Sequence, residues 1–264
     1  KYMAFIVLKD ITGKLQITVE KADHPDLVDT IDKLTPDSVL TVTGKVMEND
    51  YVKMGGIEMI PEAIEVESIA DALPIVRKEI AATKKKKAVE RSSIDQRIDY
   101  RWIDLRTDEN QLMFKAQSCF VNAMRKFLLD RNFIEIHTPK LIAAASESGS
   151  EVFKVDYFDR NAYLAQSPQF YKQMMVGVFD RVFETGPVFR AEKHNTKRHL
   201  NEYTSLDFEM GYIDGFEDIM AMETGFLQYT MELLQKEYKK ELDLLNVTLP
   251  KVDKIPQVRF DKAK

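Results

Sequence analysis

The sequence predicts an α+β protein in which an all-β N-terminal module precedes a mixed region. Residues 1 to about 68 carry short runs of alternating apolar and polar residues, which are typical of half-buried strands. From residue 98 onward, long segments with helical periodicity alternate with short apolar runs. Because 44% of the 264 residues are hydrophobic, the chain can bury a core in one large domain or two modest ones.

The N-terminal module is expected to combine short strands with one helix. Its predicted elements are strands over residues 3–9, 15–20 and 38–47, further strands near Ile57 and over 64–66, and a helix over 25–34. Five or so short strands with one intervening helix are typical of a small Greek-key barrel of the OB type. We place this domain at residues 1–68 and expect its first strand to be missing from the chain.

A connector is predicted over residues 69–97. It contains four consecutive lysines, Lys84 to Lys87. We favour a solvated charged helix or loop for this run, and the alternative is a basic patch near a nucleic-acid backbone.

Residues 98–264 are expected to form the mixed domain. The predicted elements are helices over 111–132, 168–177 and 216–239, and strands over 133–136, 152–157 and 162–165. The first helix is amphipathic, and its expected apolar side consists of Phe114, Phe120, Met124, Phe127 and Leu128.

Composition narrows the class of protein. The formal net charge of −5 does not indicate a nucleic-acid partner, so any basic surface must be local. The single Cys119 excludes a disulfide within the chain and fits a reducing compartment, so we expect a cytoplasmic protein. No run of about 18 apolar residues occurs, and neither a transmembrane helix nor a membrane partner is expected. The start, KYMAFIVLKD, has no secretory pattern and no initial Met, which suggests a piece of a longer chain.

A charged hairpin is the most informative segment. Val188 and Phe189 are strand formers that lead up to Arg190, the loop 192–201 gathers basic residues, and alternation resumes over 203–210. An arginine at a strand end offers a planar, bidentate donor fork to a phosphoryl oxygen. The alternative is a solvated hairpin loop. No glycine-rich P-loop and no Cys/His cluster with zinc spacing occurs, so no metal ligands are expected in this chain.

Three segments resemble the class II aminoacyl-tRNA synthetases, specifically aspartyl-tRNA synthetases of the archaeal and eukaryotic-like type. Motif 2 of that family is similar to FRAE, RHL and EYTSLDFEM within residues 189–210. Its amino-acid-binding strand and helix are similar to YLAQSPQFYKQM, residues 163–174, and its motif 1 is similar to FIEIHTPKLI, residues 133–142, with Pro139. The resemblance extends over nearly all of the chain and implies an antiparallel-sheet catalytic domain over residues 98–264.

The resemblance implies an ATP site on the hairpin. Arg190 is implied to be catalytic and to contact the α-phosphate and the substrate carboxylate, where cations must stabilise developing charge. The remaining ATP-binding residues implied are Ala191, Glu192, Arg198, His199, Leu200 and Tyr203, with Arg198 and His199 at the β- and γ-phosphates and Tyr203 stacked on adenine. A surface aromatic on a strand is the alternative for Tyr203.

The aspartate site is implied to involve Gln169, Lys172, Arg190 and Glu147. Gln169 and Lys172 are three residues apart and share a helix face, and a lysine suits the substrate's side-chain carboxylate. Glu147 lies in AASESGSE, which resembles the loop that closes over aspartate, although Ser148 and Gly149 stand where the family has two glycines. An ordinary exposed turn is the alternative for that loop. Gln166 is a further candidate on the preceding strand.

Phe5 and Gln16 match the family's anticodon-contacting positions. An exposed aromatic residue on a strand can stack on an unpaired base. A core position for Phe5 is the alternative, because AFIVL does not reveal which face it occupies.

The resemblance also implies partners and a reaction. These are ATP with Mg²⁺, L-aspartate, tRNA(Asp) and a second copy bound through motif 1. Motif 3 and the Mg²⁺ ligands are expected beyond residue 264, so this chain alone is expected to be inactive. The alternatives are an asparagine-specific relative and a non-catalytic nucleic-acid-binding protein derived from a synthetase. Lys172 favours aspartate, because a neutral amide gains nothing from a lysine.

Overall fold

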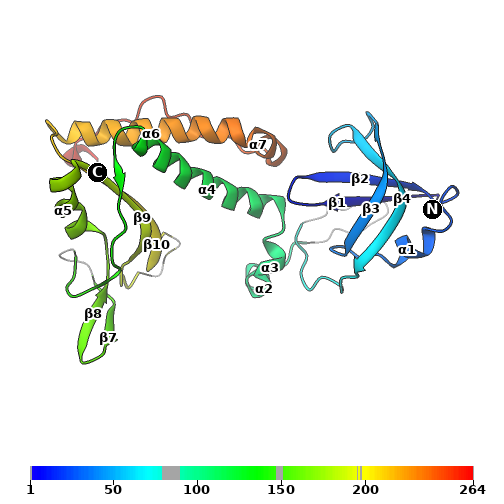
Figure 1. Ribbon diagram of the computed structural model, residues 1–264, viewed down its shortest axis with the longest axis horizontal. Coiled ribbons are helices and arrows are strands. Elements are labelled where there is room, and N and C mark those ends of the chain that lie inside the picture. Colours follow the sequence, from blue (N-terminus) through cyan, green and yellow to red (C-terminus); the bar gives the residue numbers. More distant parts are fainter. Residues whose placement is uncertain (1, 79–89, 147–150, 195, 197, 264) are drawn as a thin grey trace. The chain divides into compact units, whose positions relative to one another are not determined.

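The structure is a computed structural model that describes residues 2–78, 90–146, 151–194, 196 and 198–263. It divides into two compact units, residues 1–104 and residues 105–264 (Figure 1). The run from Lys84 to Lys87 lies outside the described residues.

The first unit contains a four-stranded sheet in the order β1-β2-β4-β3. Its strands are β1 (Met3–Lys9), β2 (Lys14–Glu20), β3 (Val39–Glu48) and β4 (Ile57–Ser68), with the short helix α1 (Val28–Lys33) between β2 and β3. The pairs β1–β2 and β3–β4 are antiparallel, whereas β2 and β4 are parallel. The predicted alternation is confirmed, but the two strand candidates near Ile57 and over 64–66 form one strand, β4.

A bulge in the β3–β4 pair explains this difference. The pairing register shifts between Thr43 and Gly44, and Gly44 lies opposite Pro61. Proline lacks a backbone N–H and is confined to edges, strand starts and bulges, so the bulge allows Pro61 to lie within one continuous strand. A Cβ atom at Gly44 would lie 2.3 Å from the Ile60 carbonyl oxygen, so the bulge requires glycine.

The strand β1 alternates between its two faces. Ala4 and Ile6 pair with Val19 and Ile17, both of which are fully buried. Phe5 is on the opposite face and is 62% exposed. The core alternative for Phe5 is therefore wrong.

The end of the first unit is organised around one buried acid. The helices α2 (Ile94–Asp99) and α3 (Arg101–Asp104) follow the connector, and α2 begins with a capping box formed by Ser93 and Gln96. Asp104 has no exposed area, and arginine nitrogens of Arg91, Arg97 and Arg101 lie 3.5, 3.5 and 2.9 Å from its carboxylate. These cations offset the cost of burying the charge.

The second unit packs helices against one face of a three-stranded sheet. This sheet has the order β10-β9-β5 and contains β5 (Ile134–Glu135), β9 (Arg181–Phe189) and β10 (Glu202–Met210). The helices α4 (Asp108–Leu129) and α6 (Phe216–Glu237) pack against each other (Figure 1). The core cluster consists of Met124, Phe127, Leu128, Phe133 and Phe183, with Leu206, Phe208 and Met210 of β10 packed against it.

Two helical details differ from the sequence prediction. Phe114 was expected on the apolar side of α4, but it is 48% exposed, whereas Leu112 and Cys119 of the same helix are buried. The helix predicted over 216–239 ends at Glu237 and is followed by the unpredicted α7 (Lys239–Leu245).

A single 3₁₀ turn, η1 (Phe260–Lys262), lies near the C-terminal end. In the described part of the chain, no helix is long and apolar enough to cross a membrane.

A second small sheet and one helix complete this unit. The sheet has the order β6-β8-β7 and contains β6 (Leu141–Ile142), β7 (Lys154–Tyr157) and β8 (Arg160–Leu164). The helix α5 (Gln169–Phe179) contacts β9 and β10. Its Lys172 pairs with Asp207 and Glu209 of β10, which alternate with the core residues Leu206 and Phe208. The helix α5 therefore covers the sheet face opposite α4 and α6.

Candidate functional site

The β9–β10 hairpin holds Arg190 at the end of its first strand. The two strands pair antiparallel up to Phe189, which lies opposite Glu202. Arg190 follows directly, and its backbone N–H donates to the Asn201 carbonyl oxygen at 2.9 Å. Pairing thus continues one residue beyond β9, so a rigid strand end positions the partly buried Arg190 side chain.

One face of the hairpin is acidic. Because side chains alternate along strands, Glu184 of β9 lies on the same face as Asp207 and Glu209 of β10. We call these three carboxylates the acidic face. The sequence analysis did not identify any of the three. The alternation of Asp207 and Glu209 with apolar residues could have indicated that both carboxylates lie on one face of the strand.

Lys172 of α5 reaches the acidic face and pairs with two of its carboxylates. Its Nζ atom lies 2.5 Å from Asp207 Oδ1 and 3.1 Å from Glu209 Oε2, and the residue is 5% exposed. Burial by itself lowers the pKa of Lys172. The hydrogen bonds and charges of Asp207 and then Glu209 outweigh this effect and raise the pKa above its usual range. The lysine is therefore charged at neutral pH and held in place.

Glu184 ties the acidic face to the segment after β5. Its carboxylate accepts hydrogen bonds from the Thr138 backbone N–H at 2.8 Å and the Thr138 hydroxyl at 2.7 Å. Lys140 Nζ lies 3.0 Å from the same carboxylate, and Glu184 is almost completely buried. The partners of this buried charge flank Pro139, so the β9 strand and the predicted motif 1 segment are joined directly.

The start of α5 positions two further polar residues. Pro168 is the N-cap, and the Gln169 N–H donates to Ser167 Oγ at 3.2 Å. Gln169 is partly buried one turn before Lys172, and Gln166 is 1% exposed. The predicted loop residue Glu147 lies outside the described residues.

The loop between β9 and β10 carries the other predicted ATP-binding residues. The Ala191 N–H donates to the Glu151 carbonyl oxygen at 3.0 Å. His199 Nδ1 lies 2.6 Å from the Thr196 hydroxyl, and His199 Nε2 lies 3.8 Å from Glu192 Oε2. Of these predicted residues, Arg198, His199 and Leu200 are exposed to solvent, and Tyr203 is 37% exposed near the start of β10.

The sheet of the first unit presents Phe5 beside a polar cluster. Phe5 pairs with Thr18, and Gln16 Nε2 donates to Thr18 Oγ1 at 3.1 Å. The Thr18 hydroxyl donates to Glu58, which also accepts from Asn49 Nδ2 at 2.6 Å. Hydrogen bonds from Thr18 and Asn49 lower the pKa of Glu58, so this carboxylate stays ionised. Only Phe5 and Gln16 of this group were predicted.

The comparisons with known proteins decide the family. A family model described as tRNA synthetases class II (D, K and N) matches residues 93–264, and one described as an OB-fold nucleic acid binding domain matches residues 1–67. This chain belongs to the class II tRNA synthetases. Within that family, it is 45% identical to an aspartate–tRNA(Asp/Asn) ligase of Methanopyrus kandleri over 94% of this chain and 56% of the relative. It is 40% identical to an aspartate–tRNA(Asp) ligase of Picrophilus torridus over 100% of this chain and 60% of the relative.

A solved structure of the same synthetase class is also similar. Asparaginyl-tRNA synthetase from Pyrococcus horikoshii, complexed with asparaginyl-adenylate, matches with 30% identity and a TM-score of 0.80 over 92% of this chain and 54% of that chain. The chain spans 56% of the length of the Methanopyrus kandleri relative and 60% of the length of the Picrophilus torridus relative. The expected fold, an OB-type module followed by a class II catalytic domain, is confirmed.

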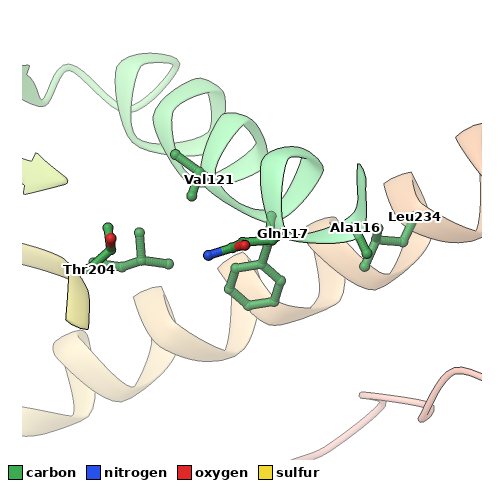
Figure 2. A pocket seen from close by; sticks show the side chains of 7 residues that line it. Ala116, Gln117, Val121, Thr204 and Leu234 are labelled. Atoms are coloured by element: carbon green, nitrogen blue, oxygen red, sulfur yellow. The ribbon is translucent and has the colours of Figure 1, made fainter. Parts of the chain in front are cut away.

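A cavity of about 280 Å³ in this synthetase chain lies away from the predicted site residues. Residues of α4, α6 and β10 line it, including Phe120 and Leu206. Figure 2 labels Val121, Thr204 and Leu234 among the side chains around it. Leu206 belongs to the apolar face of β10, whereas Lys172 contacts the acidic face. The cavity is therefore a packing gap on the helix side of the sheet.

Proposed function

We propose that this chain is part of an aspartate–tRNA ligase. The enzyme activates L-aspartate with ATP to form aspartyl-adenylate and transfers the aspartyl group to the 3′ end of tRNA(Asp). The observation that carries this proposal is the buried, charged Lys172, which α5 holds against the acidic face. The names of the curated relatives agree with this assignment. We place the OB-fold anticodon-binding domain at residues 1–68, the linker at 69–97 and the catalytic domain at 98–264.

Adenylate formation joins a carboxylate to the α-phosphate of ATP, so two anions must approach each other. Arg190 supports this step because a strand end fixes its backbone and its guanidinium offers parallel N–H donors. The loop contributes Ala191, Glu192, Arg198, His199, Leu200 and Tyr203 to ATP binding under this proposal. Gln169, Lys172 and Glu147 are assigned to aspartate.

Magnesium is expected from the family chemistry, but the described carboxylates near the site do not suit it. Asp207 and Glu209 are paired with Lys172, and Glu184 is paired with Lys140. Among the residues that the structure describes, no cluster of three or more His, Cys, Asp or Glu side chains could hold a metal ion. We therefore assign no step of the reaction to a metal ligand in this chain.

The remaining assignments concern partners. Phe5 and Gln16 are assigned to the anticodon of tRNA(Asp), and the exposure of Phe5 supports this role. A homodimer through motif 1 and a cytoplasmic location complete the proposal.

The test is ATP–pyrophosphate exchange by the full-length protein that contains this chain, assayed with aspartate and with asparagine. Aspartate should support exchange, and Arg190→Lys should lower its rate by about two decades or more, because lysine keeps the charge but loses the bidentate fork. Exchange with asparagine alone would replace the proposal with an asparagine-specific enzyme. Near-normal exchange by Arg190→Lys would reject the role of Arg190.

A further inference from the structure

The outer side of α5 carries a row of exposed apolar side chains. Lys172 reaches from α5 to the acidic face of the hairpin, whereas Phe170, Met174 and Val178 follow one another at intervals of four residues on the opposite side of the helix. These three residues are 53%, 59% and 65% exposed. Lys172 is the single charged residue of α5, so no charge interrupts the row. We call Phe170, Met174 and Val178 the α5 ridge.

Two exposed aromatic residues lie beside the end of this ridge, where the chain passes from β10 to α6. The Gly211 N–H donates to the Asp180 carbonyl oxygen at 2.8 Å, which holds this turn against the C-terminal end of α5. Tyr212 is 94% exposed, and Phe216, the first residue of α6, is 70% exposed. We call Tyr212 and Phe216 the aromatic corner. Large exposed apolar side chains that gather in this way mark an interaction surface.

The backbone at Tyr212 does not favour a tyrosine. Its φ angle is 54°, in the left-handed region. Four of the six non-glycine residues with positive φ in the described part of the chain are Asp or Asn, which tolerate this region, and the two bulky ones are Phe158 and Tyr212. Glycine would adopt the same conformation without strain. Because the side chain is also almost fully exposed, the fold itself does not account for a tyrosine at this position.

The rim of the aromatic corner is acidic. Asp180 follows α5, Asp214 and Glu217 lie at the start of α6, and all three are exposed. Arg181, which is next to Asp180, is engaged elsewhere, because its Nη1 atom donates to the Arg131 carbonyl oxygen at 3.3 Å. The last carbonyl groups of α5 add a partial negative charge at the same end. These charges favour a cationic partner and disfavour nucleic acid or an anionic lipid surface.

We propose that the α5 ridge and the aromatic corner together bind a basic amphipathic helix of another protein. Rows of side chains four residues apart are the ridges that interlock when two helices pack, so the apolar side of the partner helix lies along the α5 ridge. Its lysine or arginine residues reach the acidic rim, and an arginine can also stack on Tyr212. A second copy of this chain is a poorer partner, because a two-fold contact of this patch with itself would bring two acidic rims together.

This surface is separate from the proposed reaction. Arg190 follows one end of β9, and the aromatic corner lies beyond Met210, which pairs with Arg181 at the other end. The 9 residues of β9 span roughly 30 Å at about 3.3 Å per residue. A partner can therefore occupy the patch without entering the site around Arg190.

The experiment uses the full-length protein that contains this chain and a helical model peptide with leucine at positions i, i+3, i+4 and i+7 and lysine at the others. Fluorescence anisotropy should show binding, and Tyr212→Ala and Val178→Ser should each weaken it at least about fivefold. The same peptide with glutamate in place of lysine should not bind. Phe158→Ala is the control and should bind like the wild type, because Phe158 is also aromatic, 92% exposed and at positive φ.

Tyr212→Gly separates binding from folding. It should lose binding to the same extent as Tyr212→Ala without losing stability in urea, because glycine suits the left-handed backbone. ATP–pyrophosphate exchange should be unchanged in all these variants, so a failure of this proposal leaves the proposed function as it stands.

Three results would overturn the proposal. The first is a wild-type protein that does not bind the lysine peptide or binds the glutamate peptide equally well. The second is binding that Tyr212→Ala leaves unchanged, because the peptide would then respond only to the net charge of −5. The third is the conversion of a wild-type dimer into monomers by Tyr212→Ala, which would assign the patch to a second copy.

Discussion

Lys172 has a structural role as well as its proposed role in binding. Replacing it with methionine keeps much of its volume but leaves Asp207 and Glu209 without their shared cation. Removing one partner of a buried ion pair lowers the free energy of unfolding by about 3–5 kcal/mol. Because Asp207 and Glu209 are partly exposed, we expect a loss at the lower end of this range. We expect Lys172→Met to lower the free energy of unfolding by about 3 kcal/mol. Chemical denaturation followed by far-ultraviolet circular dichroism measures this loss.

A matched control exists on α4, where Lys126 pairs with Asp130 at the surface. Lys126→Met should leave the free energy of unfolding nearly unchanged, because solvent screens an exposed ion pair. Adding Asp207→Asn to Lys172→Met should recover part of the loss, because one uncompensated charge is removed. Equal stability of Lys172→Met and the wild type would show that the ion pair contributes nothing to the fold.

Phe5 should contribute to RNA binding and not to stability. Its side chain is 62% exposed, so truncation creates no cavity, and we expect Phe5→Ala to change the free energy of unfolding by less than about 1 kcal/mol. Filter binding with tRNA(Asp) should show weaker binding, since one stacked base contributes about 1–3 kcal/mol. Unchanged binding together with reduced stability would be the opposite of this expectation.

Glu58 makes the first unit sensitive to acid. Its native pKa is lowered from 4.5, first by the Thr18 hydroxyl and then by Asn49, so the unfolded chain takes up its proton at a higher pH than the native chain. The stabilisation is therefore present above about pH 4.5 and is lost as the pH falls through the native pKa. The wild type should have the larger free energy of unfolding at neutral pH, and its advantage over Glu58→Gln should become smaller as the pH falls. Urea unfolding followed by far-ultraviolet circular dichroism measures both free energies of unfolding. Asp10 also has a lowered pKa, but it titrates in both proteins and cancels in the difference.

At the level of elements, the bulge opposite Pro61 gives a sharp prediction. An alanine Cβ at Gly44 would lie 2.3 Å from the Ile60 carbonyl oxygen and 2.8 Å from Pro61 Cα, so backbone atoms must move. We expect Gly44→Ala to destabilise the first unit by about 1–3 kcal/mol. Gly13→Ala is the control, because nothing lies within 4 Å of its added Cβ atom, and it should be neutral or slightly stabilising. Urea unfolding followed by far-ultraviolet circular dichroism compares the two variants, and equal effects would contradict the prediction.

Local patterns predicted most elements to within a few residues. Alternation placed β1, β2 and β10, and Thr107, which accepts a hydrogen bond from the Asn110 N–H, explains why α4 begins before the first predicted residue. The division of β4 into two candidates was wrong, because the bulge that keeps the strand continuous past Pro61 depends on Gly44 in another strand, which local patterns do not show.

The site was predictable in its residue types and less so in its contacts. Lys172 was identified from the resemblance, but Asp207 and Glu209 are distant in sequence, and periodicity cannot pair a helix residue with a strand 35 residues away. Glu58 and Asn49 were missed for the same reason, since the parallel β2–β4 register brings Glu58 beside Gln16. The roles of Arg190, Gln169 and the loop residues stay predictions until they are tested with substrate.

At the level of the whole molecule, we expect a dimer. Leu129 and Ile134, at the end of α4 and in β5, are 52% and 45% exposed, and a two-fold interface uses one self-complementary apolar patch on both copies. Sedimentation of the 264-residue chain at micromolar concentration should show a dimer, and Ile134→Glu should dissociate it. Val178→Glu on α5, at a position that is 65% exposed, is the control and should leave the dimer intact. A stable wild-type monomer would count against motif 1 as the interface.

The hydrogen bonds of Glu184 extend this expectation to the chemistry of the site. Thr138 and Lys140 lie on the segment proposed to meet the second copy, while Glu184 belongs to β9, which ends at Phe189 directly before Arg190. A displacement of residues 138–140 on association would be transmitted to β9 through a buried carboxylate rather than absorbed by solvent. By thermodynamic reciprocity, any change in nucleotide affinity on association is matched by an equal change in the affinity between subunits when nucleotide binds. The rate of subunit exchange would then change with ATP concentration.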